Sequence, residues 1–272
     1  MRSALVALTA ACLLLPSFLR AKEATEEKPL IDVVFCLDST GSMGSEISAA
    51  KEKIWSIANS IMEGKPKPKI RFGVVTFRDK GDAYVVKKKD LTDDVDAVHE
   101  FLMGIRANGG GDGPEDVRSA LRSSVHDMSW SPSKEAIKLV FLVGDAPPHE
   151  DYKELPSVTE TASAAACKGI NINTIACGGI GERVETLWKE IAELSDGDYQ
   201  RLARSGGALG GAMGGAAPCT EACFGDAALS FSACKSAPMD CSSGSHSSAE
   251  EFEKAVLKSI KRKAAAKGVV LE

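Results

Sequence analysis

Apolar and polar positions alternate in two ways between residues 30 and 202. Apolar or β-branched runs predict strands at residues 30–37, 70–77, 137–143 and 171–177, with shorter ones at 83–86 and 198–202. Between them, apolar residues recur at helical spacing at 45–62, 93–103, 115–127, 159–168 and 184–194. Strands that alternate with helices predict βαβ units. The expected fold is α/β and doubly wound in the Rossmann-like manner, with a mostly parallel sheet flanked by helices.

The start of the chain has a different pattern. Residues 4–19 are almost wholly apolar and follow Met1 and Arg2, a layout typical of a secretory signal peptide. The run is shorter than the roughly 20 residues that a membrane-spanning helix needs, and Pro16 would break it. We expect residues 1–21 to be removed near Ala21, with an uncleaved N-terminal anchor as the alternative. Since no later stretch approaches membrane-spanning length, the mature chain is expected to be secreted or periplasmic, without an integral membrane segment.

The composition changes after a predicted domain at residues 29–204. Residues 205–218 are rich in glycine and alanine, which indicates a flexible linker. Residues 219–243 carry four cysteines, separated by 3, 10 and 6 residues. This spacing lacks the Cys-x-x-Cys pair of most zinc sites, so two disulfides are favoured over zinc, with three connectivities open. Residues 249–267 predict a C-terminal helix.

Three further cysteines belong to the predicted domain. Cys36 and Cys177 fall within predicted strands, and Cys167 falls on a predicted helix. We interpret them as small buried hydrophobic residues, with a disulfide between Cys167 and Cys177 as the alternative.

Composition and charge narrow the function classes. The 272 residues include 33 Lys and Arg against 38 Asp and Glu, and 44% are hydrophobic. The apolar fraction allows a sizeable core and excludes disorder over most of the chain. The net charge of −5 argues against a nucleic-acid partner, because phosphate contacts need an excess of basic residues.

Oxygen-bearing side chains follow two of the predicted strands. Asp38, Thr40 and Ser42 come after the first strand, and Asp145 comes after the strand at 137–143. A third loop, rich in glycine, carries Asp112. Doubly wound sheets bind ligands at the carboxyl ends of their strands, so these side chains are expected to meet at one edge. Carboxylates and hydroxyls suit a hard divalent cation, although each piece alone could be a helix cap or a turn.

The sequence Asp38-x-Thr40-x-Ser42 resembles the Asp-x-Ser/Thr-x-Ser signature of von Willebrand factor type A (VWA) domains, and the resemblance extends over residues 29–202. It implies a metal-ion-dependent adhesion site (MIDAS), in which Thr40 and Ser42 bind the ion through their hydroxyls. Asp38 and Asp145 would bind it directly or through water.

The middle loop departs from that family pattern. Where the family has Thr, the sequence GGGDGPED offers Asp112, and the string Asp-Ala-Pro-Pro-His occupies residues 145–149. Both features resemble a bacterial and extracellular variant of the family. A third carboxylate is expected to hold the ion more tightly and to make it less electrophilic. Whether Asp112 would bind directly or through water stays open.

The resemblance implies adhesion or assembly rather than catalysis. In this family an Asp or Glu of a protein partner replaces a water on the ion, here Mg²⁺ by expectation, with Mn²⁺ or Ca²⁺ as alternatives. The competing hypothesis is a metal-dependent hydrolase that uses the same cation. His149 is its candidate base, and neither a Gly-x-Ser-x-Gly nucleophile motif nor a phosphate-binding P-loop is present. We therefore expect an exported, non-enzymatic binding protein.

Overall fold

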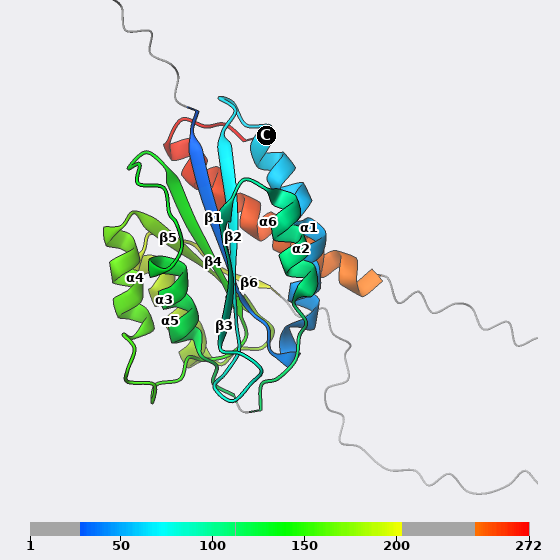
Figure 1. Ribbon diagram of the computed structural model, residues 1–272, viewed down its shortest axis with the longest axis vertical. Helices are drawn as coiled ribbons and strands as arrows, with labels where there is room; N and C mark the ends of the chain where they lie inside the picture. Colours follow the sequence, from blue (N-terminus) through cyan, green and yellow to red (C-terminus); the bar gives the residue numbers. More distant parts are fainter. Residues whose placement is uncertain (1–27, 112, 203–242, 272) are drawn as a thin grey trace, which may run out of the picture.

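The computed structural model describes residues 28–111, 113–202 and 243–271 (Figure 1). Side chains are described from residue 248 onward in the last range. The predicted signal peptide, the Gly/Ala-rich linker, the four late cysteines and Asp112 lie outside the described residues.

A six-stranded sheet forms the centre of the domain, in the order β3-β2-β1-β4-β5-β6. All neighbouring strands are parallel except β2 and β3, which are antiparallel. The doubly wound α/β prediction is confirmed. The strands are β1 Leu30–Asp38, β2 Lys69–Phe77, β3 Val86–Thr92, β4 Ile137–Gly144, β5 Ile170–Cys177 and β6 Tyr199–Leu202.

The edge strand expected at residues 83–86 was placed too early. In the structure β3 is Val86–Thr92, and it carries three consecutive lysines, Lys87, Lys88 and Lys89. A strand at the edge of a sheet has an exposed face, and lysines there discourage pairing with other chains. An apolar run was therefore the wrong signal for this strand.

Helices cover both faces of the sheet (Figure 1). One face packs against α1 Gly44–Met62, α2 Val95–Gly104 and α6 Ser243–Ala266. The other packs against α3 Val117–His126, α4 Val158–Cys167 and α5 Glu182–Leu194. Because side chains alternate along a strand, β1 sends Val33 and Phe35 to the first core and Val34 and Cys36 to the second. Within the described ranges, no helix is both long and apolar enough to cross a membrane.

Local capping sets where the helices begin. Asp116 accepts a hydrogen bond from the backbone N–H of Ser119, so α3 begins two residues later than the predicted 115–127 helix. Ser157 and Glu160 form a reciprocal capping box at the start of α4.

Helix α6 corresponds to the helix predicted at residues 249–267 but begins at Ser243, and it packs onto the sheet. Phe252 is buried, and its ring centroid lies 6.2 Å from that of Phe35 on β1. Near the other end of the helix, Arg262 Nε donates to Asp198 at 3.0 Å. The backbone of Val270 then pairs with that of Lys65. The helix therefore contributes to the same hydrophobic core as β1.

A buried ion pair lies toward the amino end of β1. Asp32 is fully buried and receives two hydrogen bonds from Arg71, at 2.8 and 2.7 Å. The backbone N–H of Ser131 donates a third at 2.9 Å. The two parallel hydrogen bonds from Arg71 offset the free energy that the Asp32 carboxylate loses when it is removed from water.

Within the described residues no cysteine forms a disulfide. Cys36 and Cys177 are buried, as predicted, whereas Cys167 is exposed because it sits in the last turn of α4. The alternative disulfide between Cys167 and Cys177 is not formed in the structure.

Candidate metal centre

The loop after β1 is organised by its first carboxylate. Asp38 Oδ1 accepts hydrogen bonds from the backbone N–H of Thr40 at 2.8 Å and from Thr40 Oγ1 at 2.7 Å. Thr40 Oγ1 in turn lies 3.5 Å from Ser42 Oγ. Asp38 and Thr40 are both buried. The alternate residues of this turn therefore direct three oxygen-bearing side chains toward one another.

Asp145 reaches the same place from the neighbouring strand. Because β1 and β4 are parallel and Leu37 pairs with Val143, both strands end at the same edge. Ser42 Oγ donates to Asp145 Oδ1 at 3.1 Å. The approach is close, since a Cβ atom added to Gly144 would lie 3.3 Å from Asp38 Cβ. The structure thus brings together Asp38, Thr40, Ser42 and Asp145.

Electrostatics at this edge disfavour the arrangement in the absence of a cation. Burial raises the pKa of Asp38 to about 6, against an ordinary value of 3.8, and the hydrogen bonds from Thr40 only partly oppose this. The carboxylates of Asp145 and Glu46 raise the pKa further by repulsion. A bound cation would compensate both the burial and the repulsion. Two carboxylates and two hydroxyls are also the oxygen ligands that Mg²⁺, Mn²⁺ and Ca²⁺ take, so the residues fit such an ion.

The glycine-rich loop lies against the Asp38 turn. The backbone N–H of Gly41 donates to the carbonyl of Gly109 at 3.1 Å, and that of Asn108 donates to the carbonyl of Ser39 at 3.1 Å. Gly109 and Gly110 have positive φ values of 82° and 73°, which explains why glycine occupies both positions. The chain that leads to Asp112 is therefore at the candidate centre, while Asp112 itself is outside the described residues.

Arg78 and Tyr84, which are not among the predicted ligands, fix the position of the Asp38 turn. Arg78 is buried and donates to the carbonyls of Ser39 at 3.2 Å and Arg106 at 2.7 Å. Its guanidinium lies over the ring of Tyr84, whose hydroxyl is 2.7 Å from Ser39 Oγ. The signal that points inward is the position of Arg78 directly after β2.

His149, the candidate base of the hydrolase hypothesis, is held between two carboxylates. Its Nδ1 lies 2.9 Å from Asp151 Oδ1, and its Nε2 lies 3.2 Å from Asp79 Oδ1. The imidazole also stacks on Tyr152 with ring centroids 4.2 Å apart. Tyr152 completes the cluster by donating its hydroxyl to Asp79 at 2.8 Å. These contacts give His149 a structural role that joins the loops after β2 and β4.

The centre is not a cluster of acidic or thiol ligands alone. Among the described residues, no three His, Cys, Asp or Glu side chains come together as a metal-binding group. Any cation here depends on the hydroxyls of Thr40 and Ser42 as well as on the two aspartates.

The sheet order and the helices on both faces define a doubly wound α/β domain. Within that class, residues 32–212 match the family model described as "von Willebrand factor A domain", and the chain belongs to this family. Domains of this family serve in protein interaction or adhesion. Membership of the family supports this general function, protein interaction or adhesion.

Curated relatives match over less than half of the chain. Von Willebrand factor A domain-containing protein 7 of Rattus norvegicus is 34% identical over 124 residues, which are 46% of this chain and 13% of the relative. The alpha-protein kinase vwkA of Dictyostelium discoideum is 30% identical over 132 residues, which are 47% of this chain and 20% of the kinase. The chain therefore spans a small part of these proteins, and the kinase name describes the relative.

Solved structures show lower identity. Proximal thread matrix protein 1 from the mussel byssus is 17% identical with a TM-score of 0.49, covering 65% of this chain and 42% of that one. The pilus adhesin SpaC of Lactobacillus rhamnosus GG is 16% identical with a TM-score of 0.48, covering 64% and 28% respectively.

Proposed function

We propose that the protein is an exported binding protein that holds a divalent cation, with Mg²⁺ as the expected ion. Asp38, Thr40, Ser42 and Asp145 are the proposed ligands, with Asp112 as a fifth. When bound, the cation offers an open coordination position to an Asp or Glu carboxylate of a protein partner. The observation that carries this proposal is the continuous series of contacts from Asp38 through Thr40 and Ser42 to Asp145.

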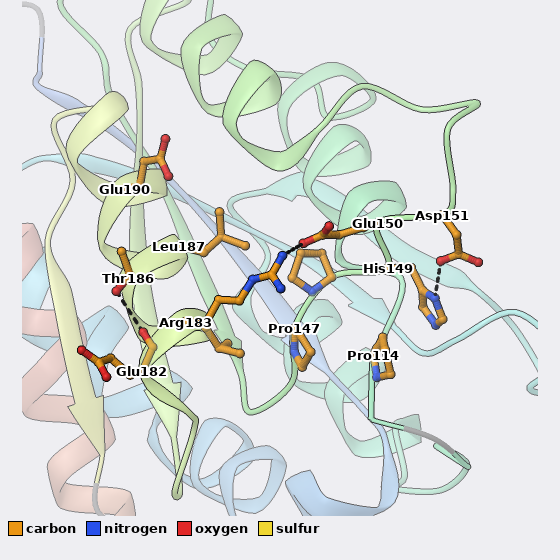
Figure 2. A pocket seen from close by; sticks show the side chains of 12 residues that line it. Pro114, Pro147, His149, Glu150, Asp151, Glu182, Arg183, Thr186, Leu187 and Glu190 are labelled. Atoms are coloured by element: carbon orange, nitrogen blue, oxygen red, sulfur yellow. Dashed lines mark hydrogen bonds and ion pairs between the residues drawn. The ribbon is translucent and has the colours of Figure 1, made fainter.

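The chain's own residues support binding more than catalysis. Arg78 and the backbone of the glycine loop hold the Asp38 turn in place, so its ligands need little reorganisation when an ion enters. The base that a hydrolase would need, His149, is hydrogen-bonded to Asp151 through Nδ1 (Figure 2), and its buried Nε2 lies 3.2 Å from Asp79 Oδ1 without a hydrogen bond. No observation in the described residues favours the hydrolase.

Calorimetric titration of the mature chain with Mg²⁺, Mn²⁺ and Ca²⁺ tests the cation. We expect binding that Asp145→Asn abolishes. The matched control is Asp93→Asn, which removes an exposed carboxylate near the start of α2 and should leave binding unchanged. Absence of binding by all three ions, or full binding by the Asp145→Asn protein, would contradict the proposal.

The partner and the export signal need separate measurements. The wild type and both variants are used as bait for extracellular proteins, with Mg²⁺ or EDTA, and partners are identified by mass spectrometry. A partner retained equally in EDTA, or equally by Asp145→Asn, would argue against a metal-bridged interaction. N-terminal sequencing of exported protein should begin close after Ala21; recovery of the intact N-terminus would contradict cleavage.

A further inference from the structure

We propose that Asn108 is a site of spontaneous covalent modification, at which the backbone nitrogen of Gly109 attacks the side-chain amide and the asparagine becomes aspartate or isoaspartate. The reaction needs only water, and its isoaspartate product has an altered backbone in the glycine-rich loop beside the candidate metal centre. The chemical step is independent of the proposed function, whereas its effect on cation binding rests on that function.

The two reacting groups are already in contact. The backbone N–H of Gly109 donates to Asn108 Oδ1 at 2.9 Å. Because Oδ1 is bonded to Cγ, this hydrogen bond places the Gly109 nitrogen next to the carbon that it must attack. A nucleophile held against its target has already lost most of the entropy that the encounter costs. Asn108 is exposed, so water can reach the product of the attack.

Gly109 leaves the attacking nitrogen without a shielding side chain. Its φ is 82°, and a Cβ atom at this position would lie 2.4 Å from Asp82 Oδ1, so the position requires glycine. Asp82 also fixes the next residue, because the N–H of Gly110 donates to Asp82 Oδ2 at 3.1 Å. The fold therefore holds the reactive dipeptide in place.

The other three asparagines of the chain lack this contact. The N–H after Asn171 donates to Ser195 Oγ at 2.9 Å. The N–H after Asn173 donates to the carbonyl of Asp198 at 2.9 Å. Asn59 is exposed but lies inside α1, where the next N–H belongs to the hydrogen-bond pattern of the helix. Attack by any of these nitrogens would first require a native hydrogen bond to break, so we expect these three asparagines to react far more slowly.

The reaction has two steps. A bond forms between the Gly109 nitrogen and Asn108 Cγ, the side-chain nitrogen leaves as ammonia with the proton of the Gly109 N–H, and a succinimide ring remains. Water then opens the ring at one of its two carbonyl carbons. Opening at Cγ gives aspartate. Opening at the main-chain carbonyl carbon gives isoaspartate, in which the chain continues through Cγ with one additional backbone carbon.

The isoaspartate product cannot keep the contacts between the glycine-rich loop and the Asp38 turn. The N–H of Asn108 donates to the carbonyl of Ser39 at 3.1 Å. The N–H of Gly41 donates to the carbonyl of Gly109, also at 3.1 Å. An additional backbone carbon between residues 108 and 109 changes the spacing of these two bonds. The Asp38 turn then loses support that orients its oxygen ligands.

Incubation of the mature wild-type chain near neutral pH tests the chemical step. Peptide mass spectrometry follows each asparagine in water enriched in a heavy oxygen isotope, which marks the product, and an isoaspartate methyltransferase with a labelled methyl donor measures isoaspartate. Asn108 should convert about 100-fold faster than Asn59, because only Asn108 has its reacting atoms in contact. It should also convert at least as fast in the folded chain as in the chain unfolded in guanidinium. Asn108→Gln should stay unconverted, because its cyclisation would need a larger ring.

The effect on the cation is measured on the same material. Anion exchange isolates the converted protein, which has one more negative charge, and calorimetry gives its affinity for Mg²⁺. The matched control is fresh Asn108→Asp, which carries the same charge on a normal backbone. The converted protein should bind about tenfold more weakly than the wild type, a typical loss when groups that orient metal ligands are removed. The control should bind at least as tightly as the wild type.

The outcomes separate the two proposals. Conversion at Asn108 that is no faster than at Asn59, or slower in the folded than in the unfolded chain, would overturn the modification site. Equal Mg²⁺ affinities of the converted protein and the wild type would overturn its effect on the candidate centre. Rapid conversion at Asn108 with no cation binding by any form would contradict the proposed function and leave the modification site standing.

Discussion

Replacing Asp38 by Asn should stabilise the metal-free protein while it abolishes cation binding. The carboxylate of Asp38 is buried and faces the charges of Asp145 and Glu46, so its ionised form is unfavourable. An Asn side chain keeps an oxygen that can accept both hydrogen bonds from Thr40. It carries no charge, so burial and repulsion no longer oppose folding.

The magnitude follows from the pKa of Asp38, which is raised from 3.8 to about 6 in the folded protein. A folded-state pKa above the unfolded value means that this group's stabilisation is fully present below the unfolded pKa and lost as pH rises through the folded one. A difference of roughly two units corresponds to about 3 kcal/mol at neutral pH. Asn does not titrate, so the gain in the free energy of unfolding should approach about 3 kcal/mol near pH 7.5 and largely vanish near pH 4.

Urea unfolding followed by circular dichroism measures this gain in EDTA at both pH values. In saturating Mg²⁺ at neutral pH, the wild type should become more stable because the ion binds only the folded state, whereas the variant should not respond. The exposed control Asp93→Asn should behave as the wild type throughout. If Asp38→Asn lowered the stability in EDTA near pH 7.5, or if its gain did not depend on pH, the description of Asp38 as a charge opposed by its surroundings would be wrong.

Three further experiments, two substitutions and one chemical labelling, test the rest of the domain. Phe252→Ala should cost about 3–5 kcal/mol in urea unfolding because its buried ring packs on β1, whereas the exposed Lys254→Ala should cost little; equal losses would show that α6 is not part of the core. Arg71→Met should cost about 3–5 kcal/mol by leaving a buried carboxylate without its charged partner, and a loss under about 1 kcal/mol would contradict this. Iodoacetamide should label the exposed Cys167 and spare Cys36 in the folded protein, because burial blocks access to the Cys36 thiol and raises its pKa to about 12. Equal labelling of the two cysteines, measured by mass spectrometry, would refute the buried position of Cys36.

Much of the fold could be predicted from the sequence because its central strands are buried on both faces. The β1 residues from Val33 to Leu37 are all apolar because helices cover both sides of the strand, and such runs are conspicuous in a sequence. The lysine-rich edge strand β3 had no such signal. A helix was predicted at residues 249–267, but helical periodicity does not say which surface a helix covers, so the packing of α6 on Phe35 could not be foreseen.

The part of the candidate centre that lies at the ends of strands could be predicted from the sequence. Asp38 ends β1 and Asp145 follows β4, and these parallel strands are neighbours in the sheet, so topology alone brings the two residues together. The support given by Arg78 and Tyr84 depends on how three loops fold over one another, which no local pattern records. The contact of His149 with Asp79 could not be predicted for the same reason, because the two residues are 70 positions apart in the chain.

Because α6 packs in the same core as the sheet, the fold does not depend on an intact peptide chain between β6 and α6. Strand β6 ends at Leu202 and α6 begins at Ser243, and both belong to one folded body. A protease that cut the connecting chain would therefore leave two fragments that stay associated without a peptide bond between them. The smaller fragment would be retained by Phe252, Val256 and Ile260, each at most 1% exposed. Fragments that end at residue 202 and begin at residue 243 are therefore expected to reassociate when they are expressed separately.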